Sequence, residues 1–193
     1  MIRIAREEDV PRILAIYAPY IIDTTYTFEY TVPSEAEFLD RFRSITAQFP
    51  WLVWEEDGII LGYVYGSAPY ARAAYGWCAE LSIYLIPAAQ GKGIGRKLYL
   101  AAEEILRRQG YQVCYALITA ENEGSVRFHQ RLGYTVTAQF PRCGYKFDRW
   151  LGVTWMEKRL NFDEYVSNPP APWLSIVDTD RKLVNILADL TLS

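Results

Sequence analysis

A glycine-rich stretch, Gln90-Gly91-Lys92-Gly93-Ile94-Gly95-Arg96-Lys97, is the part of this 193-residue chain with the clearest chemical meaning. Closely spaced glycines allow a tight turn whose backbone N–H groups point into one concavity. The helix predicted after it directs the positive end of its dipole at the turn, and Lys92, Arg96 and Lys97 add positive charge. The spacing fits neither a Walker A loop nor a dinucleotide-binding fingerprint. We expect an anion site suited to a pyrophosphate; on this stretch alone, a solvated glycine-rich turn is the alternative.

A second motif, Asn122-x-x-Ser125-x-x-Phe128-His129-x-x-Leu132-Gly133-Tyr134, lies further along the chain. Asn122 is suited to cap a helix N-terminus, to bind a ligand, or to do both. Ser125 and His129 are one helical turn apart and share a face of that helix. Because His129 is the only histidine of the sequence, this face is a candidate for acid–base chemistry.

The elements that must position these motifs alternate in type along the chain. Hydrophobic periodicity predicts strands at 2–5, 51–55, 60–67, 80–86, 113–118 and 153–160, and helices at 9–22, from 34, from the glycine-rich turn to 110 and at 122–132. The second helix begins with a capping-box pattern, Ser34 and Glu37. This order predicts an α/β (α+β) fold, in which helices flank a mixed, mostly antiparallel sheet.

The composition argues against several classes of function. Hydrophobic residues make up 51% and charged residues 22% of the sequence, as in a globular protein with a full core. The net charge of -3 argues against nucleic-acid binding. No apolar run is long enough for a membrane span, and the N-terminus reads as a strand rather than a signal peptide. Three scattered cysteines and one histidine predict neither a disulfide framework nor a metal site, so we expect a cytoplasmic location.

The two motifs, in this order and at this distance, resemble motifs A and B of the GNAT superfamily of N-acetyltransferases. Further stretches are similar to its phosphinothricin and L-amino acid N-acetyltransferase branch: Tyr26-Thr27-Phe28, Phe49-Pro50-Trp51-Leu52-Val53, Arg72-Ala73-Ala74-Tyr75, Trp77-Cys78-Ala79-Glu80 and Gly144-Tyr145-Lys146. The resemblance covers residues 2 to about 160 and departs at Glu29 and Tyr30. It implies the GNAT fold, acetyl-CoA as co-substrate, a homodimer, and acetylation of the α-amine of phosphinothricin, methionine sulfoximine, methionine sulfone or a related amino acid.

Two residues are expected to carry the chemistry that this resemblance implies. An amine must lose its proton before it attacks a thioester, and Glu80, at the start of the strand that leads to the glycine-rich turn, is the candidate base, acting directly or through one water. A strand-end carboxylate in a salt bridge is the structural alternative. His129 stands where many GNAT proteins have a tyrosine that protonates the departing thiolate. For His129, acid catalysis and simple contact with the coenzyme both stay open.

The resemblance also implies which residues hold the coenzyme. We expect the strand before the turn to offer backbone groups to the pantetheine arm as a neighbouring strand would, with one N–H stabilising the oxyanion. The expected coenzyme contacts are Ile83, Tyr84, Leu85, Gln90, Gly91, Lys92, Gly93, Ile94, Gly95, Arg96, Asn122 and Ser125.

Three residues are expected at the acceptor. Arg72 could bind a carboxylate or phosphinate bidentately, and Phe28 and Tyr75 could wall the pocket. Their structural alternatives are a solvated loop charge and core packing. A protein N-terminus, a lysine or a polyamine is the alternative acceptor, and a coenzyme-binding module without turnover is the alternative class. Arg72 favours an anionic small molecule, and Glu80 with His129 favours an enzyme.

The composition changes after Leu160. We expect residues 1–162 to form the N-acetyltransferase domain and 163–193 a C-terminal extension. Its Asn168-Pro169-Pro170-Ala171-Pro172 stretch reads as a linker, and apolar residues between 183 and 190 predict a short amphipathic helix capped near Asp178 or Asp180. The extension is expected to pack on the domain or on a dimer partner.

Overall fold

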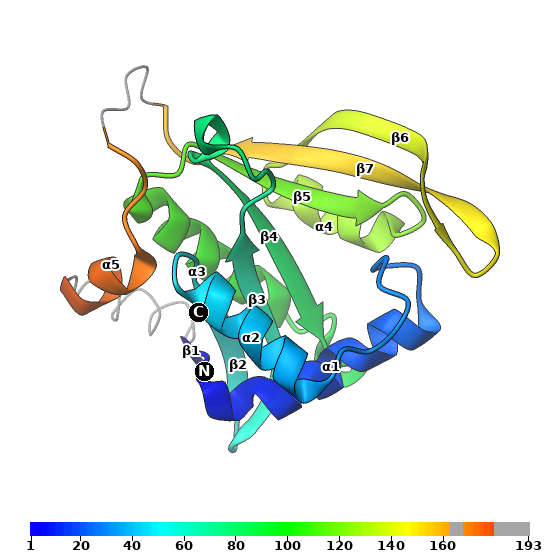
Figure 1. Cartoon of the computed structure of the whole chain (residues 1–193), viewed down its shortest axis with the longest axis horizontal. Helices are drawn as coiled ribbons and strands as arrows, with labels where there is room; N and C mark the ends of the chain where they lie inside the picture. The colour runs from blue at the N-terminus through cyan, green and yellow to red at the C-terminus, as the bar shows by residue number, and fades with distance from the viewer. Residues whose placement is uncertain (163–167, 180–193) are drawn as a thin grey trace.

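The fold, taken from a computed structural model that describes residues 1–162 and 168–179, is a sheet covered by helices on both faces (Figure 1). Its strands are β1 (Ile2–Ile4), β2 (Trp51–Glu56), β3 (Ile59–Ser67), β4 (Cys78–Leu85), β5 (Val113–Thr119), β6 (Thr135–Lys146) and β7 (Arg149–Arg159). Its helices are α1 (Val10–Asp23), α2 (Glu35–Thr46), α3 (Ile94–Gln109), α4 (Glu123–Arg131) and α5 (Trp173–Thr179), with 3₁₀ turns η1 (Glu7–Asp9), η2 (Ala73–Tyr75) and η3 (Pro87–Ala89). The described strands lie in the order β1-β2-β3-β4-β5-β7-β6 and are antiparallel except for β4 and β5, which confirms the predicted α/β class.

The sheet opens between β4 and β5. These strands pair only where residues 78–80 lie beside 113–115. Beyond that point β4 continues along β3 to Leu85, and β5 continues along β7 to Thr119. Figure 1 shows the two strands diverging from their shared end. Their facing edges therefore lack a strand partner within the described residues, and the site described below lies between them.

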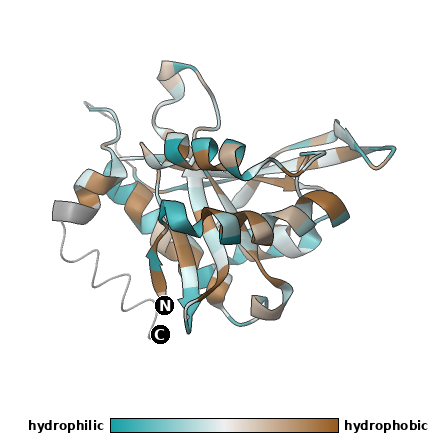
Figure 2. Ribbon diagram, turned by 60° about the horizontal axis from the view of Figure 1, so that its bottom comes forward, coloured by the Kyte–Doolittle hydropathy of each residue, from teal (hydrophilic) through white to brown (hydrophobic). Residues whose placement is uncertain are grey.

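Strand alternation divides the core into two layers. On β2, Leu52 packs in the layer with α3, whereas Trp51 and Val53 pack in the layer with α1 and α2. All three side chains are fully buried. Figure 2 shows brown and teal alternating along the helices, as in amphipathic helices that bury one face. Burial on both faces holds the central strands, which carry the candidate site.

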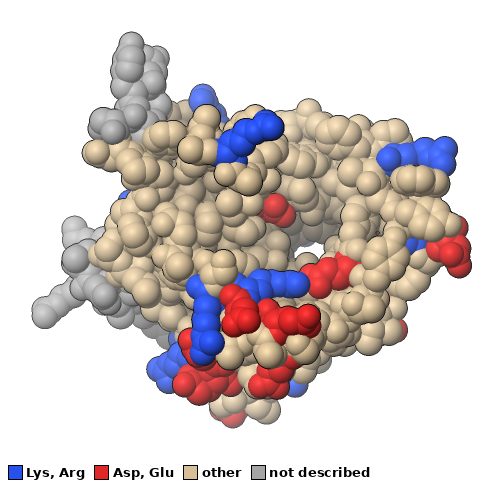
Figure 3. Space-filling model, viewed as in Figure 1, with Lys and Arg blue, Asp and Glu red and all other residues tan. Residues whose placement is uncertain are grey.

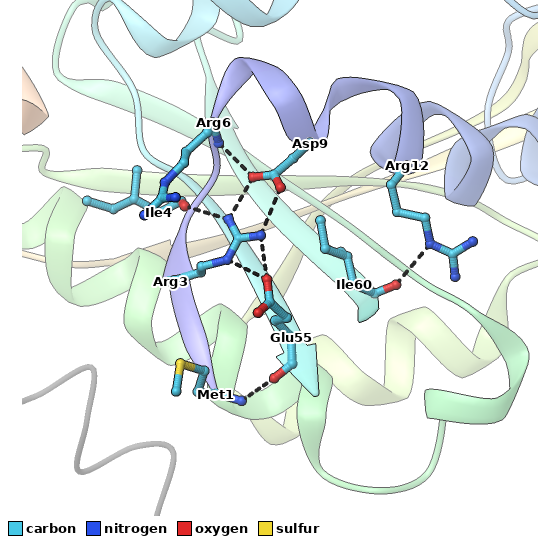
Figure 4. A network of polar contacts seen from close by, with 8 residues as sticks. All are labelled: Met1, Arg3, Ile4, Arg6, Asp9, Arg12, Glu55 and Ile60. Carbon is cyan, nitrogen blue, oxygen red and sulfur yellow. Dashed lines mark hydrogen bonds and ion pairs between the residues drawn. The ribbon is translucent and has the colours of Figure 1, made fainter. Parts of the chain in front are cut away.

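An ionic network fixes the start of α1 against the sheet. The Arg3 guanidinium donates to Asp9 Oδ2 at 2.6 Å and to Glu55 Oε2 at 2.7 Å (Figure 4). The same Asp9 carboxylate accepts from the Arg6 backbone N–H at 2.8 Å. The network joins β1, β2 and the turn before α1, and so sets the position of that helix.

The long hairpin of β6 and β7 was not fully predicted from the sequence. The sequence pattern missed β6 and began β7 only at residue 153. β6 is mostly exposed and contains Pro141 and Gly144, so it lacks the apolar alternation of a half-buried strand. Its turn uses Phe147 and Asp148, with φ of 51° and 57°, instead of the Asn-Gly or Asp-Gly pair that marks such hairpins.

The described part of the C-terminal extension packs on the domain. Trp173 is 2% exposed, and its indole Nε1 donates to Thr46 O at 2.7 Å. Gln109, at the end of α3, donates from its side-chain Nε2 to Ala171 O at 2.7 Å. Its backbone C=O accepts from the Ala171 N–H at 2.9 Å. These contacts hold the proline-rich stretch and the start of α5 against α2 and α3.

Helix α5 is not the amphipathic helix that the sequence predicts in the tail. Asp178 is part of α5, and Asp180 and residues 183–190 lie outside the described residues. Among the helices of the described ranges, none is both long and apolar enough to cross a membrane.

Candidate active site

A cavity of about 810 Å³, here called the cleft, lies between the open edge of β4, the glycine-rich turn and the start of α4. Figure 3 shows this face of the molecule hollowed at the same place. A smaller cavity of about 80 Å³ continues along β4 and β5 toward their shared end. The cleft is lined by these predicted coenzyme contacts: Ile83, Leu85, Gln90, Gly91, Gly93, Gly95, Arg96, Asn122 and Ser125. The structure thus brings most of the predicted set together, although its members come from β4, the glycine-rich turn and α4.

The glycine-rich turn has the backbone geometry of an anion site. Gly91 and Gly93 have φ of 74° and 79°, in the left-handed region that glycine adopts without strain. Helix α3 begins directly afterwards, at Ile94, so the positive end of its dipole meets the turn. Gly95 allows a close approach, because a Cβ there would lie 3.3 Å from Leu85 Cδ1.

The side chains of the turn differ in their relation to the cleft. Gln90 and Arg96 line it, whereas Lys92 is exposed outside its lining. Ile94, the first residue of α3, is 3% exposed and packs in the core. Lys97 lies with its Nζ 5.7 Å from the centre of the Trp54 ring. Arg96 is therefore the cation of the turn that lines the cleft, whereas the side chains of Lys92 and Ile94 lie outside its lining.

The open edge of β4 alternates between groups used by β3 and groups left for the cleft. The Ile86 N–H donates to Leu61 O at 2.9 Å, so the antiparallel ladder to β3 uses the even-numbered residues of β4. The backbone groups of Leu81, Ile83 and Leu85 consequently face the cleft. Tyr84 differs from the prediction, because its backbone groups pair with Tyr63 on β3.

Tyr20 of α1 is a residue of the cleft that the sequence did not reveal. Its hydroxyl donates to Leu85 O at 2.5 Å and accepts from the Leu85 N–H at 3.4 Å and from Gln90 Nε2 at 3.2 Å. Its ring and that of Tyr26 line both cavities. An aromatic stripe on a predicted helix looks like core packing, so only the structure could place these hydroxyls.

Glu80 lies where β4 and β5 separate, and its carboxylate is largely withdrawn from solvent. Burial alone raises its pKa to about 7. Among residues 1–162 and 168–179, no cation forms an ion pair with it, so the salt-bridge alternative has no support there. A carboxylate with a pKa near neutrality is suited to accept a proton during catalysis.

Tyr65 of β3 and Tyr70 of the loop before β4 lie close enough to this carboxylate to respond to its charge. The charge of Glu80 helps to raise the pKa values of the Tyr65 and Tyr70 hydroxyls, after burial as the first cause. Tyr65 is also hydrogen bonded to Ser82, two residues along β4 from Glu80. The two-residue period of β4 could have suggested Ser82, but Tyr65 required knowledge of how β3 pairs.

His129 is buried, with 3% of its surface exposed, and both ring nitrogens have partners. Nδ1 lies 2.8 Å from Ser125 O, so it carries the proton, and Nε2 accepts from the Tyr99 hydroxyl at 2.9 Å. Burial lowers the pKa of His129 to about 4, against the smaller opposite effect of the Ser125 backbone contact. At neutral pH the ring is neutral, and this geometry favours coenzyme-side positioning over acid catalysis.

Asn122 caps a helix, which is one of the two roles that the sequence left open. Its side-chain oxygen accepts from the Ser125 N–H at 3.0 Å and caps α4. Asn122 and Ser125 both line the cleft. The cap therefore sets the N-terminus of α4 at the edge of the coenzyme cavity.

The predicted acceptor residues lie on separate segments. Phe28 packs on β6, where a Cβ on Gly144 would meet its ring at 2.3 Å. The Tyr75 ring packs against that of Tyr70 at a tilt of 37° with ring centres 4.5 Å apart, and the charge of Glu80 helps to raise the pKa of Tyr70. Arg72 is exposed at the start of η2 and is absent from the lining of both cavities described above. The structure thus links Tyr75 to Glu80 through Tyr70, but it does not bring Arg72 into the cleft.

A buried lysine anchors the loop between α1 and α2, here called the 24–34 loop. Lys146 on β6 is 2% exposed and donates to Ile21 O at 2.8 Å, Thr24 O at 2.9 Å and Thr27 O at 2.8 Å. Burial lowers the pKa of Lys146, partly offset by the charge of Glu29. The loop that carries Phe28 is therefore held to the β6–β7 hairpin by charge-assisted hydrogen bonds.

Glu29, which departs from the resembled pattern, has defined partners in this loop. Arg41 of α2 donates to Glu29 Oε1 at 2.7 Å and to Oε2 at 3.3 Å. The Tyr17 hydroxyl donates to Glu29 Oε1 at 3.0 Å. Both Glu29 and Arg41 influence the pKa of Tyr65, so the pair lies on the Glu80 side of the sheet.

No group of His, Cys, Asp and Glu side chains in the described ranges could hold a metal ion.

Comparison with known proteins identifies the family. A family model described as an acetyltransferase (GNAT) domain matches residues 2–155. An L-methionine sulfoximine/L-methionine sulfone acetyltransferase of Salmonella typhimurium is 36% identical over 167 residues, covering 86% of this chain and 96% of that protein. An L-amino acid N-acyltransferase of Escherichia coli is 35% identical over 161 residues, covering 83% and 94% of the two chains.

Solved structures agree with this result. A GNAT superfamily phosphinothricin acetyltransferase from Sinorhizobium meliloti, in complex with acetyl-CoA, superimposes with a TM-score of 0.81 at 34% identity, covering 89% of this chain and 92% of that one. A putative acetyltransferase from Salmonella typhimurium with its cofactor acetyl-CoA has a TM-score of 0.82 at 34% identity, covering 89% and 98%. The chain therefore belongs to the GNAT family of acetyl-CoA-dependent N-acetyltransferases.

Proposed function

We propose that this protein transfers the acetyl group of acetyl-CoA to the α-amine of an amino acid or analogue of the phosphinothricin, methionine sulfoximine or methionine sulfone type. The observation that carries the proposal is Glu80, a buried carboxylate with a pKa of about 7, next to a cleft suited to the coenzyme. The acceptor class is supported by the names of the relatives, which share more than 30% of their residues with this chain over most of its length.

The coenzyme residues divide by the part of the ligand that they would hold. The N–H groups of the glycine-rich turn, Arg96 and the start of α3 would bind the pyrophosphate. The open edge of β4 would pair with the amides of the pantetheine arm, chiefly through Ile83 and Leu85. Asn122 and Ser125 would contact it from α4. When bound, acetyl-CoA supplies an activated acetyl thioester at the point where β4 and β5 separate.

The amine would attack the thioester directly, in a ternary complex, after Glu80 has removed its proton. An amino-acid α-amine is mostly protonated at neutral pH, and the protonated form cannot attack a thioester. Glu80 accepts that proton, either directly or through one water, and burial has raised its pKa to match the task. A backbone N–H on the open edge of β4 would stabilise the oxyanion. The C–S bond would then break, and the departing coenzyme A thiolate would take up the second proton that the amine nitrogen loses. We assign His129 to positioning the α4 face, since its ring is neutral and already paired with Tyr99.

On the acceptor side, Phe28 and Tyr75 would form walls and Arg72 would hold the acid group. The contact between the Tyr75 and Tyr70 rings, near Glu80, supports the placement of Tyr75. Arg72 lies on the exposed loop before β4, from which its long side chain could reach an acceptor bound over Glu80.

A direct assay tests the proposal. The purified protein is mixed with acetyl-CoA, a thiol reagent and a panel of acceptors: methionine sulfoximine, methionine sulfone, phosphinothricin, common amino acids, their decarboxylated amines, a lysine peptide and spermidine. We expect acetylation of one or more amino-acid analogues and at most trace acetylation of the matched decarboxylated amines. Preference for spermidine or the peptide would move the protein to another acceptor class, and absence of turnover with any amine would favour a binding module.

We propose a homodimer that uses the β6–β7 hairpin. This hairpin exposes large aromatic side chains: Phe140, Tyr145, Phe147 and Trp150 are each 45–53% exposed. Exposed apolar groups concentrated on one element mark interaction surfaces. Light scattering of the protein and of a Trp150→Glu variant would test it, with the variant expected to be monomeric.

We also propose residues 1–162 as the catalytic domain, with 163–193 as an extension, and the cytoplasm as the location. The division is supported by the family match to residues 2–155. The location is supported by the three free cysteines and by the need for acetyl-CoA.

A further inference from the structure

Tyr20 occupies a position on β4 that the coenzyme would need. In an antiparallel or parallel ladder, a neighbouring strand uses both the N–H and the C=O of alternate residues. On the open edge of β4 these residues are Leu81, Ile83 and Leu85. The Tyr20 hydroxyl takes both backbone groups of Leu85, the C=O at 2.5 Å and the N–H at 3.4 Å.

The same hydroxyl also reaches the glycine-rich turn. Gln90 Nε2 donates to it at 3.2 Å, so one oxygen joins the last residue of β4 to the first residue of the turn. These two segments are where the pantetheine arm and the pyrophosphate would meet. Burial raises the pKa of Tyr20, so it remains a neutral phenol able to donate and accept at once.

We propose that Tyr20 occupies the coenzyme's place in the free cleft, and that its hydroxyl must leave Leu85 and Gln90 before acetyl-CoA can pair with β4. The proposal rests on the coenzyme placement given under Proposed function. It makes Tyr20 a positioning residue that sets the affinity for acetyl-CoA. A ligand that must displace an internal hydrogen bond binds with an apparent Kd raised by the cost of that bond.

The surroundings of Tyr20 allow this displacement. Its ring lies against Tyr84 on one side, with ring centres 5.0 Å apart, and 6.4 Å from Tyr26, which is 45% exposed. Pro19, one residue earlier, removes a backbone donor from the last part of α1. Tyr20 is only partly buried against the core layer of Trp51, so its hydroxyl can move toward the exposed Tyr26 while its ring stays at the edge of that layer.

Calorimetric titration of Tyr20→Phe with coenzyme A tests the proposal without turnover. The variant keeps the ring and removes only the competing hydroxyl. We expect its Kd to fall by about two- to tenfold, the range of one net hydrogen bond. At the same time the free variant should unfold at a lower temperature than the parent, because Leu85 and Gln90 lose a partner. Lower stability together with tighter binding is a combination that a purely structural tyrosine would not give.

Tyr17→Phe is the matched control. It removes a hydroxyl from the same helix, one turn earlier, whose partners are Thr27 and Glu29 rather than the cleft. We expect lower stability and an unchanged Kd for coenzyme A. An unchanged or higher Kd in a folded Tyr20→Phe protein overturns the proposal. Failure of the parent protein to bind coenzyme A would instead overturn the coenzyme placement itself, so the two failures are distinguishable.

Discussion

The proposed coenzyme site and the proposed acceptor site, here called the coenzyme half and the acceptor half of the candidate active site, are built in different ways. The coenzyme half consists mainly of backbone: left-handed glycines at 91 and 93, a helix start, and the open edge of β4. The acceptor half depends on side chains that meet from distant segments, as Lys146 does with the 24–34 loop. A ligand held by local backbone geometry tolerates sequence change, whereas a pocket assembled by long-range contacts can be altered by single substitutions. This difference fits one constant co-substrate and a variable acceptor.

Glu80→Gln tests the residue that lies between the two halves, and it should have the largest effect on catalysis. A positioned base typically contributes about 10²–10⁴-fold, so kcat at neutral pH should fall by about that factor. Coenzyme binding should change little, because Glu80 lies outside the cleft lining. Steady-state kinetics over a pH series measures this. Parental kcat/KM should rise as the carboxyl ionises around pH 7, and the loss in the variant should shrink at high pH.

The pH dependence of stability gives an independent test of the raised pKa of Glu80. The folded pKa of about 7 exceeds the usual value of 4.5, so the folded state favours the protonated form. Ionisation therefore removes stability as the pH rises from about 4.5 to 7. Glu80→Gln should be more stable than the parent at pH 8 and similar to it at pH 4. A folded variant with parental kcat and an unaltered pH profile would make Glu80 structural.

Gly93→Val tests the backbone half, with Gly58→Val as its matched control. Both glycines have a left-handed φ, 79° and 76°, and an added Cβ meets no atom within 4 Å at either site. Both variants should therefore lose a similar stability, about 1–3 kcal/mol from backbone strain. Only Gly93→Val should raise the acetyl-CoA KM, by about tenfold or more, because it distorts the anion site. Equal acetyl-CoA KM values in the two folded variants would contradict our placement of the pyrophosphate.

Sequence could predict the backbone half because its signals are local. The three glycines of the turn and the Asn122 cap are readable from spacing alone, and the strand at 80–86 from alternation. The protonation state of His129 could not be predicted, since it depends on burial and on Tyr99 from another helix. The contacts made by the predicted acceptor residues could not be predicted either.

The contacts of the acceptor half escape prediction because they join segments that lie far apart in the chain. The packing of Phe28 on Gly144 and the anchoring of the 24–34 loop by Lys146 both rely on β6, the strand that the apolar pattern missed. No local signal marks which loop a lysine will reach when it lies more than a hundred residues away.

Lys146→Met tests the side-chain half. It leaves three backbone carbonyls of α1 and the loop without their donor, so stability should fall by about 1–3 kcal/mol. The loop carrying Phe28 should loosen, and we expect the acceptor KM to rise by about tenfold with the coenzyme Kd unchanged. Lys158→Met is the control, because it removes a lysine paired with Glu103 at 2.6 Å, away from the loop. A loss of coenzyme binding in Lys146→Met would show that the two halves are not independent.

Arg72→Ala should have the smallest effect on kinetics, and it tests whether the acceptor half extends to the loop before β4. Arg72 is exposed on the loop before β4, so solvent screens its charge and an ion pair with the acceptor should be worth about 0.5–1 kcal/mol. The acceptor KM should rise about two- to fivefold, and the acetyl-CoA KM should not change. Arg43→Ala is the control for the loss of a surface charge, because Arg43 is an exposed arginine of α2 that pairs with Glu7. The effect should disappear when the acceptor is a decarboxylated amine, because that acceptor has no acid group for Arg72 to hold. If the parent enzyme uses an amino acid and its decarboxylated amine equally well, acid recognition belongs neither to Arg72 nor to any other residue, and the acceptor half selects only by shape.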